Sequence, residues 1–244
     1  MQIESAMQTY IGARQVNQDR MFAAVGQVNG MECGLFCVAD GMGGTQDGHY
    51  AAELAVEGLL NWWESDCFEQ PNFPVIFNEI NEKIMAHAKV QKTTLGTTLS
   101  LLFICNGKYY ITHTGDSRIY LAKKKLFCSK ITTLTQDHTY GADKQRAGMP
   151  KQEISINPKK NMLTSCLGVF ENPKLFTSTG TMQKNDVFLI CSDGLYRVLN
   201  DKALAKTITS KKHITTLATE LIQMAEKRGA KDNATAVVVR GVVG

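Results

Sequence analysis

LFCVADGMGG, residues 35–44, is an apolar run that stops at an acid, Asp40, and continues into three glycines within four residues. Such a run is typical of a buried β-strand. The glycines that follow, Gly41 first, permit a tight turn and the close approach of another backbone. A single Asp-Gly turn is common in any domain and needs no functional explanation. A functional explanation is needed because the pattern is repeated along the chain.

Four further acids stand at the edges of predicted strands: Asp19, Asp116, Asp193 and Asp232. DVFLICSDGL, residues 186–195, repeats the arrangement most closely, with an apolar run that ends in Asp-Gly. Strand ends that gather at one edge of a sheet can bring such acids together. Together with Asp40 these make five acids at strand edges, which turns required only for chain reversal do not explain.

Length and composition limit what these acids can do. A chain of 244 residues with 43% hydrophobic and 20% charged residues is typical of one large globular domain, predicted here over 1–244. The net charge of +4 is too small to indicate nucleic acid binding, and no apolar stretch approaches the length of a membrane span. Seven cysteines without a C-x-x-C motif, and no signal peptide, favour a reduced, cytoplasmic protein.

The predicted elements alternate between strands and paired helices, without a repeat or a linker. We expect strands up to residue 39, an irregular segment over 137–168, a strand from 186 and a final strand over 235–239. Helices are predicted over about 50–64, 74–90 and 213–228, with Gly229 ending the last. We also expect the strand over 109–114 to lie beside the strand that ends at Asp193. This order predicts an α+β sandwich with its helices outside.

Clustered carboxylates repel one another unless they are protonated or bridged by cations. The five histidines and seven cysteines show no zinc-type spacing, so the candidate ligands are hard oxygens, which select Mg²⁺ or Mn²⁺. Two such ions can share a water and aim it for in-line attack, which suits hydrolysis of a phosphate ester. Arg14 is a candidate phosphate anchor, although from the sequence alone a surface arginine is the safer interpretation.

Eight segments together resemble the metal-dependent serine/threonine protein phosphatases of the type-2C (PPM) family, in their compact bacterial form. The resemblance implies a four-layer α-β-β-α sandwich, in which helices flank two central, mainly antiparallel β-sheets. The segments appear in the family's order: RQVNQDR 14–20, VADGMGG 38–44, LGTTL 95–99, THTGDSRIY 112–120, LTQDHT 134–139, LTSCLG 163–168, ICSDGL 190–195 and KDNATAVVV 231–239.

The resemblance also implies roles for the residues that match the family's motifs. Asp40 would bridge two Mn²⁺ or Mg²⁺ ions, the Gly41 carbonyl would bind one of them, and Asp193 with Asp232 would bind the other. Asp19 would bind directly or through water, and Arg14 would hold the phosphate. Asp116 would join Asp193 around a third ion. Residues 137–168 would form the flap that shapes substrate choice.

The substrates implied by the resemblance are phosphoproteins, hydrolysed at phosphoserine or phosphothreonine by direct attack of a water activated by the two metals. A serine/threonine kinase would act in opposition, and the protein would be a monomer. Two departures from the family stand out. Gln18 replaces a common Glu, and Met42 and Thr45 stand where other members have a histidine. The motifs therefore do not identify the general acid that would protonate the leaving group. His49 is interpreted as a residue at the start of a helix.

Two alternative functions remain at this point. Cys191 and Arg197 match the C-x₅-R spacing of cysteine-dependent phosphatases, in which a thiolate attacks the phosphate. Cys191 belongs to an apolar strand, however, and Asp193 would place a carboxylate in the phosphate cradle. The second alternative is a pseudophosphatase that only binds partners. Retention of Asp40, Asp193 and Asp232 argues against it, because clustered acids without compensation cost stability.

Overall fold

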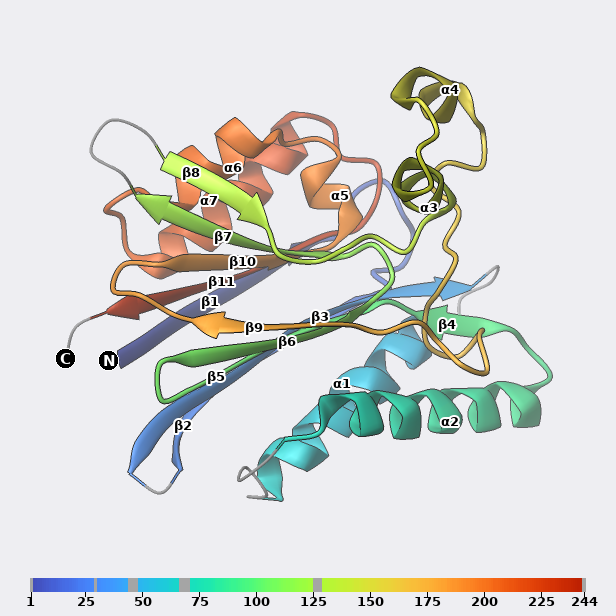
Figure 1. Ribbon diagram of the computed structural model, residues 1–244, viewed down its shortest axis with the longest axis horizontal. Helices are drawn as coiled ribbons and strands as arrows, with labels where there is room; N and C mark the ends of the chain where they lie inside the picture. Colours follow the sequence, from blue (N-terminus) through green and yellow to red (C-terminus); the bar gives the residue numbers. More distant parts are fainter. Residues whose placement is uncertain (1, 29, 44–47, 66–70, 125–128, 243–244) are drawn as a thin grey trace.

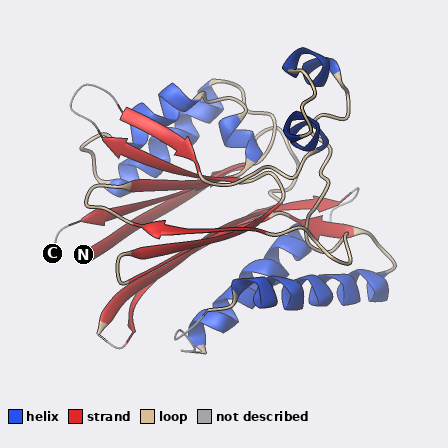
Figure 2. Ribbon diagram, viewed as in Figure 1, coloured by secondary structure: helices blue, strands red, loops and turns tan. Residues whose placement is uncertain are grey.

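The computed structural model describes residues 2–28, 30–43, 48–65, 71–124 and 129–242. Two antiparallel β-sheets lie face to face, and helices cover the outer side of each (Figures 1 and 2). The predicted four-layer α-β-β-α sandwich is therefore confirmed. The first sheet has the order β1 (Gln2–Tyr10), β11 (Ala234–Val242), β10 (Val187–Cys191), β7 (Arg118–Lys124) and β8 (Ser129–Thr133). The second has the order β2 (Asp19–Val28), β3 (Met31–Gly43), β5 (Leu99–Cys105), β6 (Lys108–Thr114) and β9 (Phe176–Thr181), with β4 (Leu95–Thr97) paired to β3.

The side chains of β3 explain why a fully apolar run becomes the central strand of this arrangement. Phe36 and Val38 pack between the two sheets, whereas Leu35 and Cys37 pack under the helices on the other face. Since successive side chains of a strand point to opposite faces, both faces of β3 must be apolar when both are covered.

Three long helices cover the sheets close to their predicted bounds. α1 (Gly48–Glu64) and α2 (Phe73–Gln91) pack on the second sheet, and α7 (Ile214–Lys227) packs on the first. α7 ends just before Gly229, which has a left-handed φ of 72°, as predicted. The short helices α5 (Asp193–Tyr196) and α6 (Asp201–Ile208) cover the rest of the first sheet.

The segment over 137–168 is predicted to be irregular, and this prediction is wrong in part because the segment contains two short helices. α3 (Tyr140–Arg146) and α4 (Lys151–Ile156) project beside the sandwich (Figure 1). The Thr139 hydroxyl caps α3 by accepting a 3.2 Å hydrogen bond from the Ala142 amide. The Gly148–Pro150 segment therefore separates two helices rather than preventing them.

The strand over 109–114 is expected beside the strand that ends at Asp193, and this prediction is also wrong. β6 pairs with β5 and β9 in the second sheet, whereas β10 pairs with β7 and β11 in the first. The chain changes sheets between β6 and β7, at 115–117. Gly115 has a φ of 102°, and a Cβ there would lie 2.5 Å from Thr98 Cβ. This crossing still carries Asp116 to the end of the sandwich where Asp193 lies.

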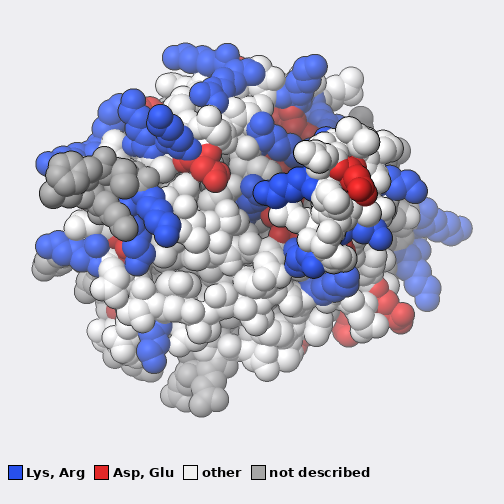
Figure 3. All heavy atoms as spheres, turned by 45° about the horizontal axis from the view of Figure 1, so that its top comes forward, with Lys and Arg blue, Asp and Glu red and all other residues white. Residues whose placement is uncertain are grey.

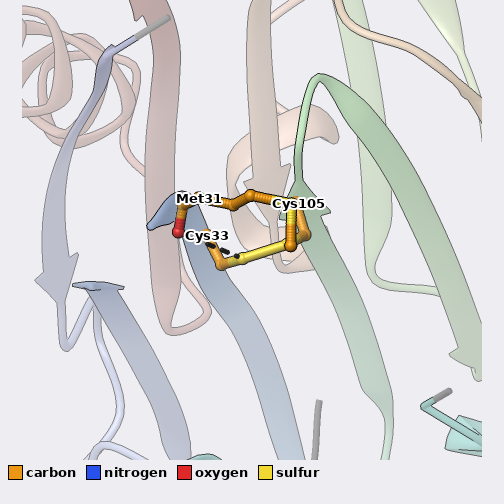
Figure 4. The surroundings of a disulfide bond; sticks show 3 residues. All are labelled: Met31, Cys33 and Cys105. Carbon is orange, nitrogen blue, oxygen red and sulfur yellow. Dashed lines mark hydrogen bonds between the residues drawn. A yellow bond between two sulfur atoms is a disulfide. The ribbon is translucent and has the colours of Figure 1, made fainter. Parts of the chain in front are cut away.

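One pair of cysteines departs from the expected reduced state. Cys33 and Cys105 are direct partners on the adjacent strands β3 and β5, and a disulfide joins them (Figure 4). Sequence spacing did not indicate this pair, because 72 residues separate the two positions and only strand pairing brings them together. No helix within the described ranges is long and apolar enough to cross a membrane.

Candidate metal centre

A cavity of about 320 Å³ opens where β3 and β10 end and β11 begins. Six of the seven predicted site residues line it: Arg14, Asp40, Gly41, Asp116, Asp193 and Asp232. The seventh, Asp19, lies behind Asp40 as its direct partner in the β2–β3 pairing. Residues that are up to 218 positions apart in sequence thus meet at one end of the sandwich.

Backbone hydrogen bonds hold Asp40 and Gly41 in place. The Asp40 amide donates to the Thr98 hydroxyl at 3.0 Å, and the Gly41 amide donates to the Gln18 carbonyl at 3.1 Å. A Cβ at position 41 would lie 2.2 Å from the Gly48 carbonyl oxygen, so a side chain cannot be accommodated there. Burial, followed by the charges of Asp19 and Asp193, raises the pKa of Asp40 well above its usual range.

Asp19 is buried, with 4% of its surface exposed. Its Oδ2 accepts hydrogen bonds from the Ser192 hydroxyl at 2.7 Å and the Thr235 hydroxyl at 2.6 Å, whereas its buried Oδ1 has no hydrogen-bond partner. Burial raises the pKa of Asp19 to about 6, against the effect of these two hydroxyls. A buried carboxylate oxygen without a partner is costly, and a cation at this position would compensate it.

Asp193 and Asp116 share one guanidinium. Arg197 Nη2 lies 2.7 Å from Asp193 Oδ2 and 3.3 Å from Asp116 Oδ2. Burial and the charge of Asp193 raise the pKa of Asp116 to about 7, while Arg197 opposes the rise. The pKa of Asp193 is also raised, chiefly by burial. Sequence reasoning considered Arg197 only as part of a C-x₅-R motif and missed this contact.

Arg14 lies in the loop before β2 and contacts the acid that precedes β11. Its Nη2 donates to Asp232 Oδ2 at 2.7 Å, and 59% of the Arg14 side chain remains exposed. Asn233 holds this loop in place: its Nδ2 donates to the Ile11 and Val16 carbonyls, and its Oδ1 accepts from the Gln18 amide. Sequence reasoning missed Asn233 as a structural anchor, although it directly follows Asp232 in the KDN segment.

The donor set fits a hard divalent cation. Four carboxylates line the cavity, those of Asp40, Asp116, Asp193 and Asp232, and Asp19 Oδ1 lacks a partner. In the described part of the chain, no three acidic, histidine or cysteine side chains already converge as a metal cage. Arg14 and Arg197 instead neutralise Asp232 and the Asp193–Asp116 pair. A cation bound at the same carboxylate oxygens would compete with these guanidinium groups.

None of the described residues that line the cavity is a histidine. Met42 and Gln18, two of the departures from the family's motifs, line it, and Thr45 lies outside the described residues. His49 is the second residue of α1, and its ring lies 4.1 Å from that of Tyr50. Its interpretation as a helix-start residue is confirmed.

The structure does not favour the cysteine-dependent alternative. Cys191 is fully buried in β10, and burial raises the pKa of its thiol far above the usual range. A thiolate there is strongly disfavoured. Arg197, the other member of the motif, contacts carboxylates instead of lining a phosphate cradle around the sulfur.

Two residues from the segment over 137–168 complete the cavity wall. Asn161 and Leu163 both line it, close to the acids. Leu163 is the first residue of the LTSCLG segment, whereas no motif marks Asn161. Their position results from the hydrogen bonds that tie this segment back to the sandwich, such as Leu167 N to Thr97 O at 2.9 Å.

Comparison with known proteins agrees with the fold and with the class of enzyme that the motifs indicate. The sequence profile of the family described as Protein phosphatase 2C matches residues 9–237. The Serine/threonine phosphatase stp of Listeria monocytogenes is 30% identical, over 84% of this chain and 83% of that protein. The serine/threonine phosphatase of S. agalactiae superposes with a TM-score of 0.88 at 28% identity, covering 99% of this chain and all of that one. The catalytic domain of the phosphatase PstP, in complex with two manganese ions, superposes with a TM-score of 0.81 at 25% identity over 99% of both chains.

The chain therefore belongs to the protein phosphatase 2C family, and it shares the fold of the S. agalactiae enzyme. It is a metal-dependent protein serine/threonine phosphatase that uses a divalent cation, and its substrates are phosphoproteins. Neither the pseudophosphatase nor the cysteine-dependent alternative is favoured by these findings.

Proposed function

We propose that the chain hydrolyses phosphoserine and phosphothreonine in proteins at a centre of two divalent ions, Mn²⁺ or Mg²⁺. One observation carries this proposal: Asp40, Asp193, Asp232 and Arg14 line one cavity, with the unpartnered Oδ1 of Asp19 behind it. Bound ions would supply Lewis acidity and a water of lowered pKa for in-line attack on the phosphorus.

Each residue has a distinct task in this proposal. Asp40 would hold both ions, and the Gly41 carbonyl would bind one of them. Asp193 and Asp232 would bind the other, while Asp19 would bind directly or through a water. A side chain at position 41 would clash with the Gly48 and Gln18 carbonyls, so the backbone here stays closely packed.

Arg14 is proposed to bind the substrate phosphate. Its guanidinium already contacts the cavity through Asp232 and is largely exposed, so a phosphate can reach it. A guanidinium binds two phosphate oxygens at once, which orients the ester as well as attracting it. The face in Figure 3 displays more Lys and Arg than Asp and Glu, which suits an anionic phosphoprotein.

The remaining roles complete the proposal. Asp116 with Asp193 is proposed to hold a third ion, and residues 137–168 are proposed to contact the peptide around the phosphorylated residue. One catalytic domain over 1–244 is supported by the pairing of β1 with β11, which joins the two ends of the chain. A monomeric, cytoplasmic enzyme that opposes a serine/threonine kinase stays a prediction.

The direct test is hydrolysis of an aryl phosphate and of a phosphothreonine peptide by the purified chain. We expect activity with Mn²⁺, a lower or equal rate with Mg²⁺, and loss of activity in EDTA that added Mn²⁺ restores. Full activity in EDTA would contradict the proposal, as would uptake of fewer than two ions per chain in calorimetry.

A further inference from the structure

Arg197 lies where its guanidinium can neutralise two carboxylates at once. The same nitrogen, Nη2, is within ion-pair distance of Asp193 Oδ2 and of Asp116 Oδ2. Asp116 lies just before β7 and Asp193 just after β10, and these strands pair as far as Arg118 and Cys191, so the two acids emerge at the same end of neighbouring strands. One cationic group therefore neutralises acids from both strands.

The point between these two oxygens is also the position at which a third divalent ion would be held. Asp116 and Asp193 are only 7% and 13% exposed, and like charges so placed repel one another strongly. One positive group between them relieves the repulsion, and two cannot occupy the same place. Arg197 and an ion at this pair must therefore exclude one another.

A second cavity beside the acids can accept the Arg197 side chain when it leaves them. Its side chain also lines a neighbouring cavity of about 430 Å³, which Arg14, Lys231 and Asp232 line as well. The Arg197 amide is held by the Asp193 carbonyl at 3.0 Å, so the backbone stays in place while the side chain can rotate. With 40% of its side chain exposed, the guanidinium can leave the acids without losing contact with water.

We propose that Arg197 is an internal competitor for the third metal site, holding the Asp116–Asp193 pair until an ion displaces it. This inference rests on the proposed function, since it presumes two tightly bound ions. Arg197 is a positioning residue here: it acts through the two acids. The third site is then weaker than the acids alone would make it, and its occupancy depends on the metal concentration.

Titration of the metal-free protein with Mn²⁺, with free Mn²⁺ counted by electron paramagnetic resonance, tests this inference. Removing the competitor in Arg197→Ala should tighten the third ion about two- to fivefold, the range expected for a partly exposed ion pair. Arg197→Gln serves as a second neutral variant of similar length. The matched control Arg197→Lys keeps a cation and should bind the third ion like the wild type.

The double variant Asp116→Asn/Arg197→Ala should lose the third ion and keep the first two. Thermal melting in EDTA gives a separate measurement: Arg197→Ala should melt lower than the wild type and gain more from Mn²⁺. Equal third-ion affinity in the wild type and both neutral variants would overturn the inference alone. A raised KM with unchanged Mn²⁺ binding would also overturn it, by making Arg197 a substrate contact. Failure of the wild type to bind two ions would overturn the proposed function first.

Discussion

The Ser192 hydroxyl donates a 2.7 Å hydrogen bond to the Asp19 carboxylate, across 173 residues of sequence. Asp19 begins β2 in the second sheet, and Ser192 directly follows β10 in the first. The Thr235 hydroxyl in β11 donates to the same oxygen. Asp19 thus joins the two sheets at the end where the cavity lies, and its other oxygen has no partner.

Asp19→Asn should separate these two roles. Asparagine keeps one oxygen to accept from Ser192 and Thr235, but it removes a buried charge. We expect the free energy of unfolding in EDTA at pH 7.5 to rise by about 1–2 kcal/mol, and Mn²⁺ binding to weaken. Denaturant unfolding with and without Mn²⁺ measures both effects, with the exposed Glu57→Gln as control. Loss of stability in EDTA would contradict the expectation.

The stability of the metal-free protein should fall as pH rises. Burial raises the pKa of Asp19 to about 6 and that of Asp116 to about 7, so the folded state binds protons more tightly than the unfolded state. Their stabilisation is therefore fully present below the usual carboxyl pKa, near 4, and is lost as pH rises through 6 to 7. Melting temperatures in EDTA between pH 4.5 and 7.5 measure this, and Asp116→Asn should flatten the upper part of the curve. A melting temperature that rises with pH over this interval would contradict the prediction.

Asp40→Asn and Asp193→Ala should each nearly abolish turnover, because each removes a carboxylate that we assign to the metals. The expected loss is at least about 100-fold in kcat. Asp201→Asn, on the exposed first turn of α6, is the control and should retain wild-type activity. Activity within a few-fold of the wild type for Asp40→Asn or Asp193→Ala would refute the two-metal assignment.

Arg14→Ala should act mainly through KM. Loss of a charged hydrogen bond to phosphate costs about 1.5–3 kcal/mol, or roughly 10- to 100-fold in KM. Metal uptake should remain, since Asp232 loses only a competing partner. Steady-state kinetics on the phosphothreonine peptide and Mn²⁺ titration measure both properties. Arg240→Ala is the control, because Arg240 pairs with Glu4 near the end of β11 that lies away from the cavity. An unchanged KM would show that Arg14 is a surface residue that does not bind the substrate phosphate.

Asp116→Ala should fold, keep the two tight ions and lose most activity on a phosphopeptide. The reason is that the variant lacks one of the two carboxylates proposed for the third ion. Mn²⁺ stoichiometry measured alongside the rate provides the test. If the variant melts well below the wild type and activity falls only in step with the folded fraction, Asp116 is a structural residue.

Local patterns in the sequence predicted most of the elements and six of the residues that line the cavity. The spacing of apolar residues predicted α1, α2 and α7, and the runs before Asp40 and Asp193 predicted β3 and β10. These signals are local because a helix or strand must present an apolar face within a few residues. The motifs from Arg14 to Asp232 then indicated the family and the chemistry of its acids.

Only the tertiary structure decided which of these elements meet. Strand periodicity does not specify a partner, so it could not place β6 away from β10, or pair Cys33 with Cys105. Arg197 carries no local mark of its contact with Asp116, which depends on the crossing between the sheets. Side-chain contacts between remote segments result from how whole faces pack, and that packing is a property of the complete chain.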